Sequence, residues 1–153
     1  MNWLSPAELQ AWMAFLRTIA GLDYSLDRQL TADSGLTHGT YGILAALSDA
    51  PDGSRHMSEL AGLARFSQSR LSHAVVRLEQ EGLLTREVCT HDKRGIHAVL
   101  TPRGRELMEQ AAPGHVALVR QLVFDRLTPE QVTAFGEIMQ VVRTGLDEMG
   151  APN

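Results

Sequence analysis

The sequence predicts a mainly α-helical protein with one small β-hairpin, and two features support this prediction. Apolar residues recur at three- and four-residue spacing over most of the 153 residues, which is the period of an amphipathic helix. Residues 83–90 and 96–101 instead have the pattern of strands, joined by the polar run Asp92-Lys93-Arg94-Gly95. Since two short helices precede this hairpin, we expect a winged helix-turn-helix with longer helices at both ends.

The length and composition are ordinary for a single globular domain covering residues 1–153. The apolar fraction is 44% and the charged fraction is 21%. No apolar run approaches the length of a membrane span, and the first residues lack the basic and apolar regions of a signal peptide. The single cysteine, Cys89, excludes an intramolecular disulfide and fits a reducing compartment. We therefore expect a cytoplasmic protein with no membrane partner.

Two helices are expected before the helix-turn-helix. Ser5 suits an N-cap and Pro6 the first helical turn, and an apolar stripe follows. Gly35 interrupts this pattern, and a second helix is expected over residues 38–47. After a turn-forming run, residues 55–57 could add a third strand to the hairpin.

The two helices of the helix-turn-helix are short. Ser58 suits the N-cap of the first helix, and a turn is expected near Phe66. Ser67 suits the N-cap of the second helix, which we expect to run to about Glu81 and to stop at Gly82.

Two more helices are expected after the hairpin. Pro102 opens the first, and Pro113-Gly114 predicts a kink or break inside it. The run Thr128-Pro129-Glu130 caps the last helix. The first of these helices is expected to carry the apolar residues Leu107, Met108, Val116, Val119, Leu122, Val123 and Leu127.

The terminal helices carry more apolar surface than a small winged helix could cover. We therefore expect residues 1–36 and 102–153 to pair two copies of the chain as a homodimer, with residues 37–101 as a separate winged lobe. The alternative is that the terminal helices fold back on their own domain.

The helix that begins after Ser67 has the pattern of a DNA-reading helix. Leu71, Ala74, Val75 and Leu78 share one side and are expected to face the core. The N-terminal half of such a helix enters the major groove, where glutamine can pair with adenine and arginine with guanine or phosphate. The candidate contact residues are Ser67, Gln68, Ser69, Arg70, Ser72, His73 and Arg77.

The hairpin carries a second set of candidate DNA contacts. Arg94 lies at its tip, where the turn itself has no need of arginine, so we expect it to enter the adjacent minor groove. Lys93 is a candidate phosphate contact. Asp92 is expected to pair with Arg94 or Arg77 and to hold that arginine in place.

The charge distribution supports a nucleic-acid partner, although the whole chain has a net charge of −4. Between Arg55 and Arg105 there are nine basic and five acidic residues, so this segment has a net charge of +4 and the remainder −8. A basic centre that coincides with the helix-turn-helix and hairpin would orient the protein on double-stranded DNA.

Four stretches of the chain form a set: LAGLARFSQSRLSHAVVRLEQEGLLTRE, HDKRG, HAVLTPRGREL and DRLTPEQ. Together they resemble the MarR family of bacterial transcriptional regulators, and the resemblance covers most of the chain. It implies a homodimer on a pseudo-palindromic operator, usually a repressor, released by a small and often phenolic or aromatic ligand or, in some members, by cysteine oxidation. The resemblance assigns groove reading to Ser67, Gln68, Ser69, Arg70 and His73, and wing contacts to Asp92 and Arg94.

The sensing residues are less defined than the DNA contacts. Oxidation-sensing members of the family carry their cysteine in the first helix, whereas Cys89 lies in a wing strand, where we expect a buried structural thiol. A ligand pocket would lie between the dimerisation helices and the winged helix. Its candidate residues are Trp12, Arg17, His38 and Tyr41, for which core packing or a solvated surface is an equally good explanation.

Other functions have weaker support. The chain lacks the glycine-rich, metalloprotease and nucleophile-elbow motifs of common enzymes, and one cysteine cannot form a zinc knuckle. His91 and His97 could meet across the hairpin, but solvated residues explain them better than a metal site, so we expect no cofactor and no metal. A winged helix used for protein contact without DNA is the main alternative, and an activator is as consistent with the residues as a repressor.

Overall fold

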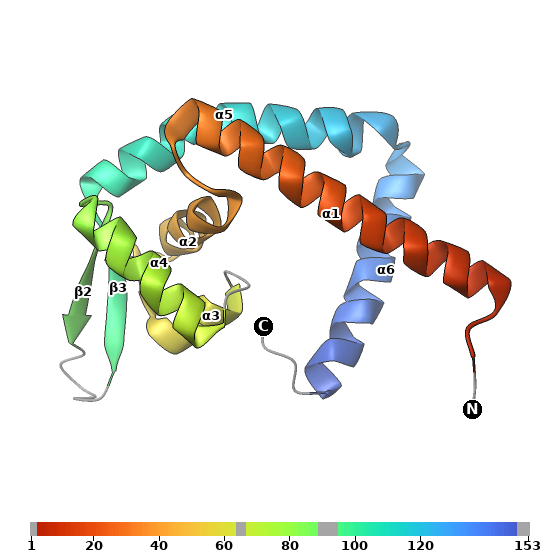
Figure 1. Cartoon of the computed structure of the whole chain (residues 1–153), viewed down its shortest axis with the longest axis horizontal. Coiled ribbons are helices and arrows are strands. Elements are labelled where there is room, and N and C mark those ends of the chain that lie inside the picture. Colours follow the sequence, from red (N-terminus) through yellow and green to blue (C-terminus); the bar gives the residue numbers. More distant parts are fainter. Residues whose placement is uncertain (1–2, 64–66, 89–94, 150–153) are drawn as a thin grey trace.

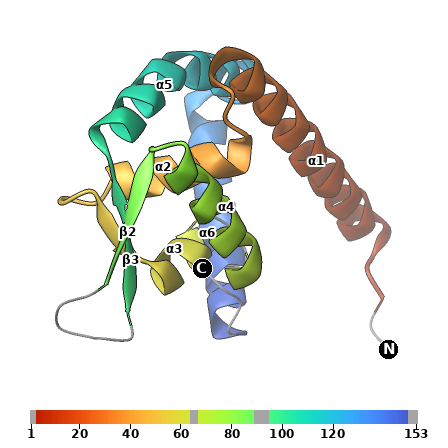
Figure 2. The ribbon, with the colours of Figure 1, turned by 60° about the vertical axis from the view of Figure 1, so that its left-hand side comes forward.

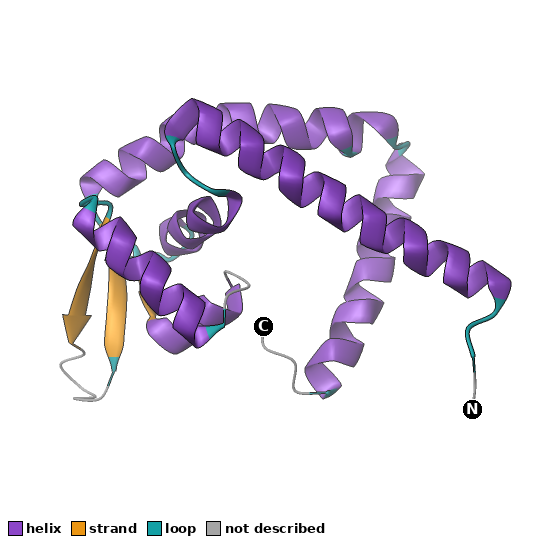
Figure 3. Ribbon diagram, in the orientation of Figure 1, coloured by secondary structure: helices purple, strands orange, loops and turns teal. Residues whose placement is uncertain are grey.

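The structure, a computed structural model, describes residues 3–63, 67–88 and 95–149. The described elements, in chain order, are α1 (Pro6–Ser34), α2 (His38–Ser48), β1 (Ser54–His56), α3 (Met57–Leu63), α4 (Gln68–Gln80), β2 (Leu84–Val88), β3 (Ile96–Leu100), α5 (Pro102–Leu122), a 3₁₀ turn (Phe124–Arg126) and α6 (Pro129–Glu148). Helices dominate, with one small sheet (Figure 3). The predicted fold class, a mainly helical winged helix-turn-helix with flanking helices, is confirmed.

The elements divide into a lobe and a set of long helices. Figure 1 shows α2, α3, α4 and the sheet gathered near one end of α5, while α6 leaves the other end. Helices α1 and α5 lie side by side, and α2 packs against both of them. The rotated view in Figure 2 shows the N-terminal half of α1 extending away from the lobe.

The helix ends follow the predicted capping residues. Ser5 is the N-cap of α1, where its hydroxyl accepts from the Glu8 backbone N–H and the Glu8 carboxylate accepts from the Ser5 N–H. Gly35 ends the helix at φ 74°, a left-handed conformation that favours glycine. Thr128 and Gln131 form the same reciprocal cap on α6.

The sheet is antiparallel with the strand order β1-β3-β2. Strand β1 pairs with β3 through Arg55 and Ala98, which confirms the third strand that the sequence suggested. Strand β2 pairs with β3 from Leu84 opposite Leu100 to Val88 opposite Ile96. Since β2 has no strand on its other side, it is a free edge of the sheet.

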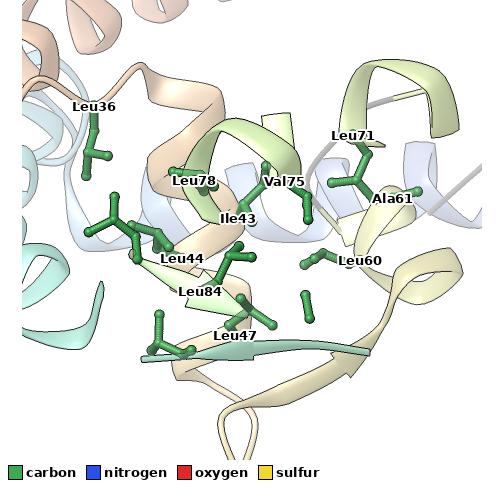
Figure 4. Packing of buried hydrophobic residues seen from close by; sticks show 13 residues of the cluster. Leu36, Ile43, Leu44, Leu47, Leu60, Ala61, Leu71, Val75, Leu78 and Leu84 are labelled. Carbon is green, nitrogen blue, oxygen red and sulfur yellow. The ribbon is translucent and has the colours of Figure 1, made fainter. Parts of the chain in front are cut away.

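The core lies within the lobe, between α2, the inner face of α4 and the sheet (Figure 4). Ile43, Leu44 and Leu47 of α2 are fully buried, as are Val75 and Leu78 of α4. The remaining buried members of this cluster are Leu36, Leu60, Ala61, Leu71, Leu83, Leu84, Ala98 and Leu100.

Two predictions about helix ends were wrong. Ser58 is not an N-cap, because α3 begins at Met57 directly after β1 and the Ser58 backbone N–H contacts Nδ1 of His56 at 3.3 Å. Val123 and Leu127 do not continue α5, because the helix ends at Leu122 and the chain tightens into a 3₁₀ turn before α6.

Of the kink or break predicted at Pro113, the break is absent, because α5 is one continuous helix over Pro102–Leu122. The helix is nevertheless curved where it passes over the lobe (Figure 2). Pro113 is exposed, so water can reach the carbonyl group that its missing N–H leaves without a partner. At Gly114 helix α1 comes so close that an added Cβ would lie 2.9 Å from both Asp33 Oδ2 and Gln29 Nε2. Packing against α1 therefore keeps the helix intact where the local sequence favours an interruption.

The start of α5 offers a test of how closely the long helices pack on the lobe. A Cβ at Gly104 would lie 2.0 Å from the Leu83 carbonyl oxygen and 2.9 Å from Leu100 Cδ1. Because one of these contacts is backbone, Gly104→Ala is expected to lower the free energy of unfolding by about 3 kcal/mol. The measurement is urea unfolding at fixed protein concentration. Gly42→Ala is the control: nothing lies within 4 Å of its added Cβ, so we expect no loss of stability. Equal stability of the two variants would contradict the close packing.

Candidate nucleic-acid interface

The predicted reading helix is α4, and its orientation follows from the residues that it buries. Leu71, Val75 and Leu78 are at most 1% exposed and pack into the lobe core. Their side of the helix faces inwards, as their spacing in the sequence predicts. The opposite side is therefore turned to solvent along the whole helix.

The candidate contact residues lie on this outer side. Ser67 is the N-cap, and its hydroxyl accepts from the Arg70 backbone N–H at 3.3 Å. Gly82, at φ 73°, follows the C-terminal end of the helix. The side chain of Gln68 lies outside the described part of the structure. The exposed candidates are Ser67, Ser69, Arg70, Ser72, His73 and Arg77, so the described candidates of the α4 set lie at the surface and not in the core.

The wing begins beside this face. Strands β2 and β3 form its two arms, and the tip that joins them, with Asp92, Lys93 and Arg94, lies outside the described residues, as does Cys89. The expected pairing of Asp92 with Arg94 or Arg77 therefore stays a prediction. In the described part of the chain, Arg77 contacts Glu81 of its own helix at 3.7 Å.

Part of the basic character of the segment is used inside the protein. Arg55 forms an ion pair with Glu59 and also donates to the Ala46 carbonyl oxygen. Arg86 of β2 forms an ion pair with Glu79 of α4 at 2.7 Å. The count of nine basic residues in the segment therefore overstates how many cations are available to a nucleic acid. The Glu79–Arg86 contact was not anticipated from the sequence, because its partners belong to different elements.

Two of the four predicted pocket residues meet at the junction of α1, α2 and α5. Tyr41 and His38 both contact His115 of α5. The centroid of the His115 ring lies 4.6 Å from that of Tyr41 and 5.8 Å from that of His38. His38 Nδ1 lies 2.8 Å from the Asp23 carboxylate of α1, and the His38 backbone N–H donates to Asp27. His115 was missed in the sequence, where no local pattern distinguishes it from a surface histidine.

Burial dominates the chemistry of this junction. His115 Nδ1 is buried and has no hydrogen-bond partner among the described residues. Burial, with a smaller contribution from His38, lowers the pKa of His115 from its ordinary value of 6.5. Burial also raises the pKa of the Tyr41 phenol, assisted by the charge of Asp49. Both groups are therefore held in their neutral forms near neutral pH.

The other two pocket candidates lie elsewhere in the chain. Trp12 stacks on Phe15 in the exposed half of α1, and its side chain is 48% exposed. It precedes Asp23 by eleven residues, which is about 16 Å along a helix. Arg17 lies in the same exposed half. Within one chain, the structure does not bring Trp12 and Arg17 to His38 and Tyr41.

A hollow of about 300 Å³ lies between α1 and α5, and none of the four candidate pocket residues lines it. Its lining residues are Tyr24, Ser25, Arg28, Gln29, Ala32, Leu118 and Leu122. Across residues 3–63, 67–88 and 95–149, no three His, Cys, Asp or Glu side chains are grouped as metal ligands. None of the helices in those ranges is long and apolar enough to cross a membrane.

A short helix pair with an exposed polar second helix, followed by a strand hairpin, defines the winged-helix class of nucleic-acid-binding proteins. Comparison with known proteins narrows the assignment from this class to one family. A sequence model of the MarR family matches residues 34–95. In agreement with the resemblance noted in the sequence, the chain belongs to the MarR family of transcriptional regulators. Since these proteins are regulators, the expectation of a non-enzymatic protein is also met.

Two solved structures are similar over nearly the whole chain. Sco3205, a MarR family regulator from Streptomyces coelicolor solved in complex with DNA, is 48% identical with a TM-score of 0.91, over 95% of this chain and 91% of that one. AbsC, a MarR family regulator from the same organism, is 38% identical with a TM-score of 0.90, over 97% and 99%. The transcriptional repressor YetL of Bacillus subtilis is 30% identical over 108 residues, which are 71% of this chain and 64% of the repressor.

His115 is expected to make the free energy of unfolding depend on pH. The unfolded chain binds a proton at the ordinary pKa of 6.5, whereas the folded state resists protonation of His115. The stabilisation from neutral His115 is therefore present above pH 6.5 and is lost as the pH falls below it. We expect wild-type protein to lose more unfolding free energy between pH 7.5 and 5.5 than His115→Phe, in which the ring cannot titrate. The two proteins differ only at position 115, so parallel stability curves would contradict this assignment.

Proposed function

We propose that the protein is a homodimeric transcriptional repressor that binds a pseudo-palindromic operator in double-stranded DNA. The observation that carries the proposal is the polar face of α4, where Ser69, Arg70, His73 and Arg77 share the exposed side of a helix anchored by its leucines. The likeness to Sco3205, whose structure includes DNA, supports DNA as the partner of this chain. We place this activity in the cytoplasm, where bacterial DNA lies.

Dimerisation is supported by the apolar side chains that the terminal helices expose. Within the described chain, α6 has no buried residue, and Val141 and Met149 are 74% and 85% exposed. Exposed apolar patches of this kind mark association surfaces. In this proposal residues 1–36 and 102–153 form the dimer interface, and residues 37–101 form the DNA-binding lobe. Other large apolar residues exposed on the terminal helices are Trp3, Leu9, Trp12, Leu16, Ile19, Phe135, Ile138 and Leu146.

The geometry of the dimer would determine the spacing of the two operator half-sites. Each α4 would occupy a major groove and each wing, with Asp92, Lys93 and Arg94, an adjacent minor groove. The two α4 helices would then lie about one helical turn of DNA apart. A ligand would release the operator by changing this separation through the helices that join the lobes.

Ligand control is proposed at the junction between the lobe and the dimer helices. His38 and Tyr41 offer polar-tipped rings there, and a small aromatic or phenolic molecule has the shape and polarity to contact both. Trp12 and Arg17 could complete such a pocket only if a second chain supplied them.

A winged helix used only for protein contact remains the alternative function. The experiment that separates the two is selection from a random duplex library with the purified protein at two salt concentrations. We expect recovery of an inverted repeat with half-sites about ten base pairs apart. Affinity for the selected site should fall steeply with salt, as expected for about six to ten phosphate contacts. No enrichment at either salt concentration by a folded dimer would refute the proposal.

The two groove contacts can be separated by mutation. Arg70→Ala is expected to weaken operator binding by about tenfold or more and to alter base preference, because arginine reads guanine bidentately. Arg94→Ala should weaken binding at A·T-rich flanking positions, where a narrow minor groove attracts arginine. Fluorescence anisotropy with labelled operators measures both effects. Arg120→Ala, on the exposed surface of α5, is the control for the loss of an arginine: once its dimeric state is shown to equal that of the wild type, its affinity should be unchanged. Wild-type affinity of Arg94→Ala would exclude the wing from DNA binding.

A further inference from the structure

One carboxylate of the reading helix binds three donors of a single residue in the wing. Oε1 of Glu79 accepts from the Arg86 backbone N–H at 2.9 Å. Oε2 accepts from Arg86 Nε at 2.9 Å and lies 2.7 Å from Nη2. The contact therefore holds both the main chain and the guanidinium group of Arg86.

The position of Arg86 gives this contact a structural consequence. Successive N–H groups of an antiparallel strand point alternately towards and away from the neighbouring strand. Strand β2 is at the edge of the sheet, and the Arg86 N–H binds a helix side chain rather than β3. Glu79 thus occupies a hydrogen-bonding position on the free edge of the wing strand. The last turn of α4 and the middle of β2 are joined by a direct polar bridge.

A neighbouring ion pair shows how specific this bridge is. Arg77 and Glu81 belong to the same helix end, are about half exposed, and approach only to 3.7 Å. Such a pair contributes little and joins no second element. Glu79 and Arg86 are less exposed, at 31% and 40%, and meet with paired, short hydrogen bonds. The hydrogen bonds from Arg86 also lower the pKa of Glu79, which keeps the carboxylate ionised.

We propose that Glu79 is a positioning residue for DNA recognition, which holds the wing at a fixed distance from α4 so that the major-groove and minor-groove contacts are made together. This role rests on the proposed DNA-binding function. Glu79 itself needs no contact with DNA. Its side chain determines where β2, and with it the base of the wing, lies relative to the reading helix.

For Glu79→Gln, the proposal predicts a change in operator affinity opposite in sign to the change expected from charge alone. Removing a negative charge near a polyanion should tighten binding, and releasing Arg86 would add a cation for phosphate. If Glu79 positions the wing, Glu79→Gln should instead weaken operator binding, by about tenfold. The matched control is Glu81→Gln, which removes the same charge two residues away but breaks only the long pair with Arg77. Glu81→Gln is expected to bind as tightly as wild type or more tightly.

Operator affinity is measured by anisotropy for the full-length dimers, with the selected operator as the probe. Glu79→Asp supplies a second variant, which keeps the charge but is too short to hold both the main chain and the side chain of Arg86. We expect it to bind more weakly than wild type as well. In an Arg94→Ala background the effect of Glu79→Gln should shrink, because the wing contact that it positions is already lost. Binding by Glu79→Gln that equals or exceeds that of Glu81→Gln would overturn the proposal.

A measurement without DNA separates this inference from the function on which it rests. Amide hydrogen exchange should accelerate at Arg86 and along β2 in Glu79→Gln, and stay unchanged in Glu81→Gln. Faster exchange with no operator binding by wild-type protein would refute the DNA-binding function while preserving the bridge. Unchanged exchange in Glu79→Gln would refute the positioning role of Glu79, whatever the wild-type protein binds.

Discussion

The burial of one face of α4 is the constraint on which the rest of the lobe depends. Leu71, Val75 and Leu78 occupy successive turns of the helix and are held between α2 and the sheet. Removing one buried leucine side chain from such a core typically costs 2–5 kcal/mol, roughly, so rotation of the helix about its axis is strongly opposed. The polar residues on the other side, among them Ser69, His73 and Arg77, are exposed. These residues face solvent because the apolar side of α4 packs into the core.

The long helices follow a different principle, because their apolar residues are exposed within one chain. Among the described residues, α6 has no buried residue, and the two buried residues of α1, Leu26 and Leu30, lie in its C-terminal half. The lobe meets the long helices at the start of α5, around Gly104, and at a junction of α1, α2 and α5. Asp23 of α1, His38 of α2 and His115 of α5 meet there, and Gly114 allows α1 and α5 to approach closely.

Local chemistry explains which parts of the structure were predictable. Serine and threonine caps at Ser5, Ser67 and Thr128 placed three helix starts, and glycine at Gly35 placed a helix end, because each acts within one turn of its own position. The inward and outward faces of α4 followed from spacing alone. Pro113 does not break α5, because the local rule ignores the support that α1 gives to α5.

The contacts that the sequence did not reveal join residues from different elements. Glu79 and Arg86 are seven residues apart and face each other only because the chain reverses at Gly82, with φ 73°. His115 reaches His38 and Tyr41 through the packing of α5 on α2, which no periodicity encodes. A count of charges along the chain likewise misses contacts between different elements. A net charge cannot distinguish an arginine held by a glutamate from one available to DNA.

The internal ion pairs also clarify how a protein of negative net charge would approach DNA. Since Arg55, Arg77 and Arg86 each pair with a carboxylate of the same segment, these three pairs add no net charge, and the net charge of +4 comes from the other residues of the segment. The flanking segments carry the larger negative charge, and they form the long helices at the side of the lobe. A duplex would be repelled by these helices and attracted by the segment that contains α4 and the wing. Electrostatics in this arrangement favours an orientation of approach, whereas the close contacts on α4, held in place by its buried leucines, would decide which sequence is bound.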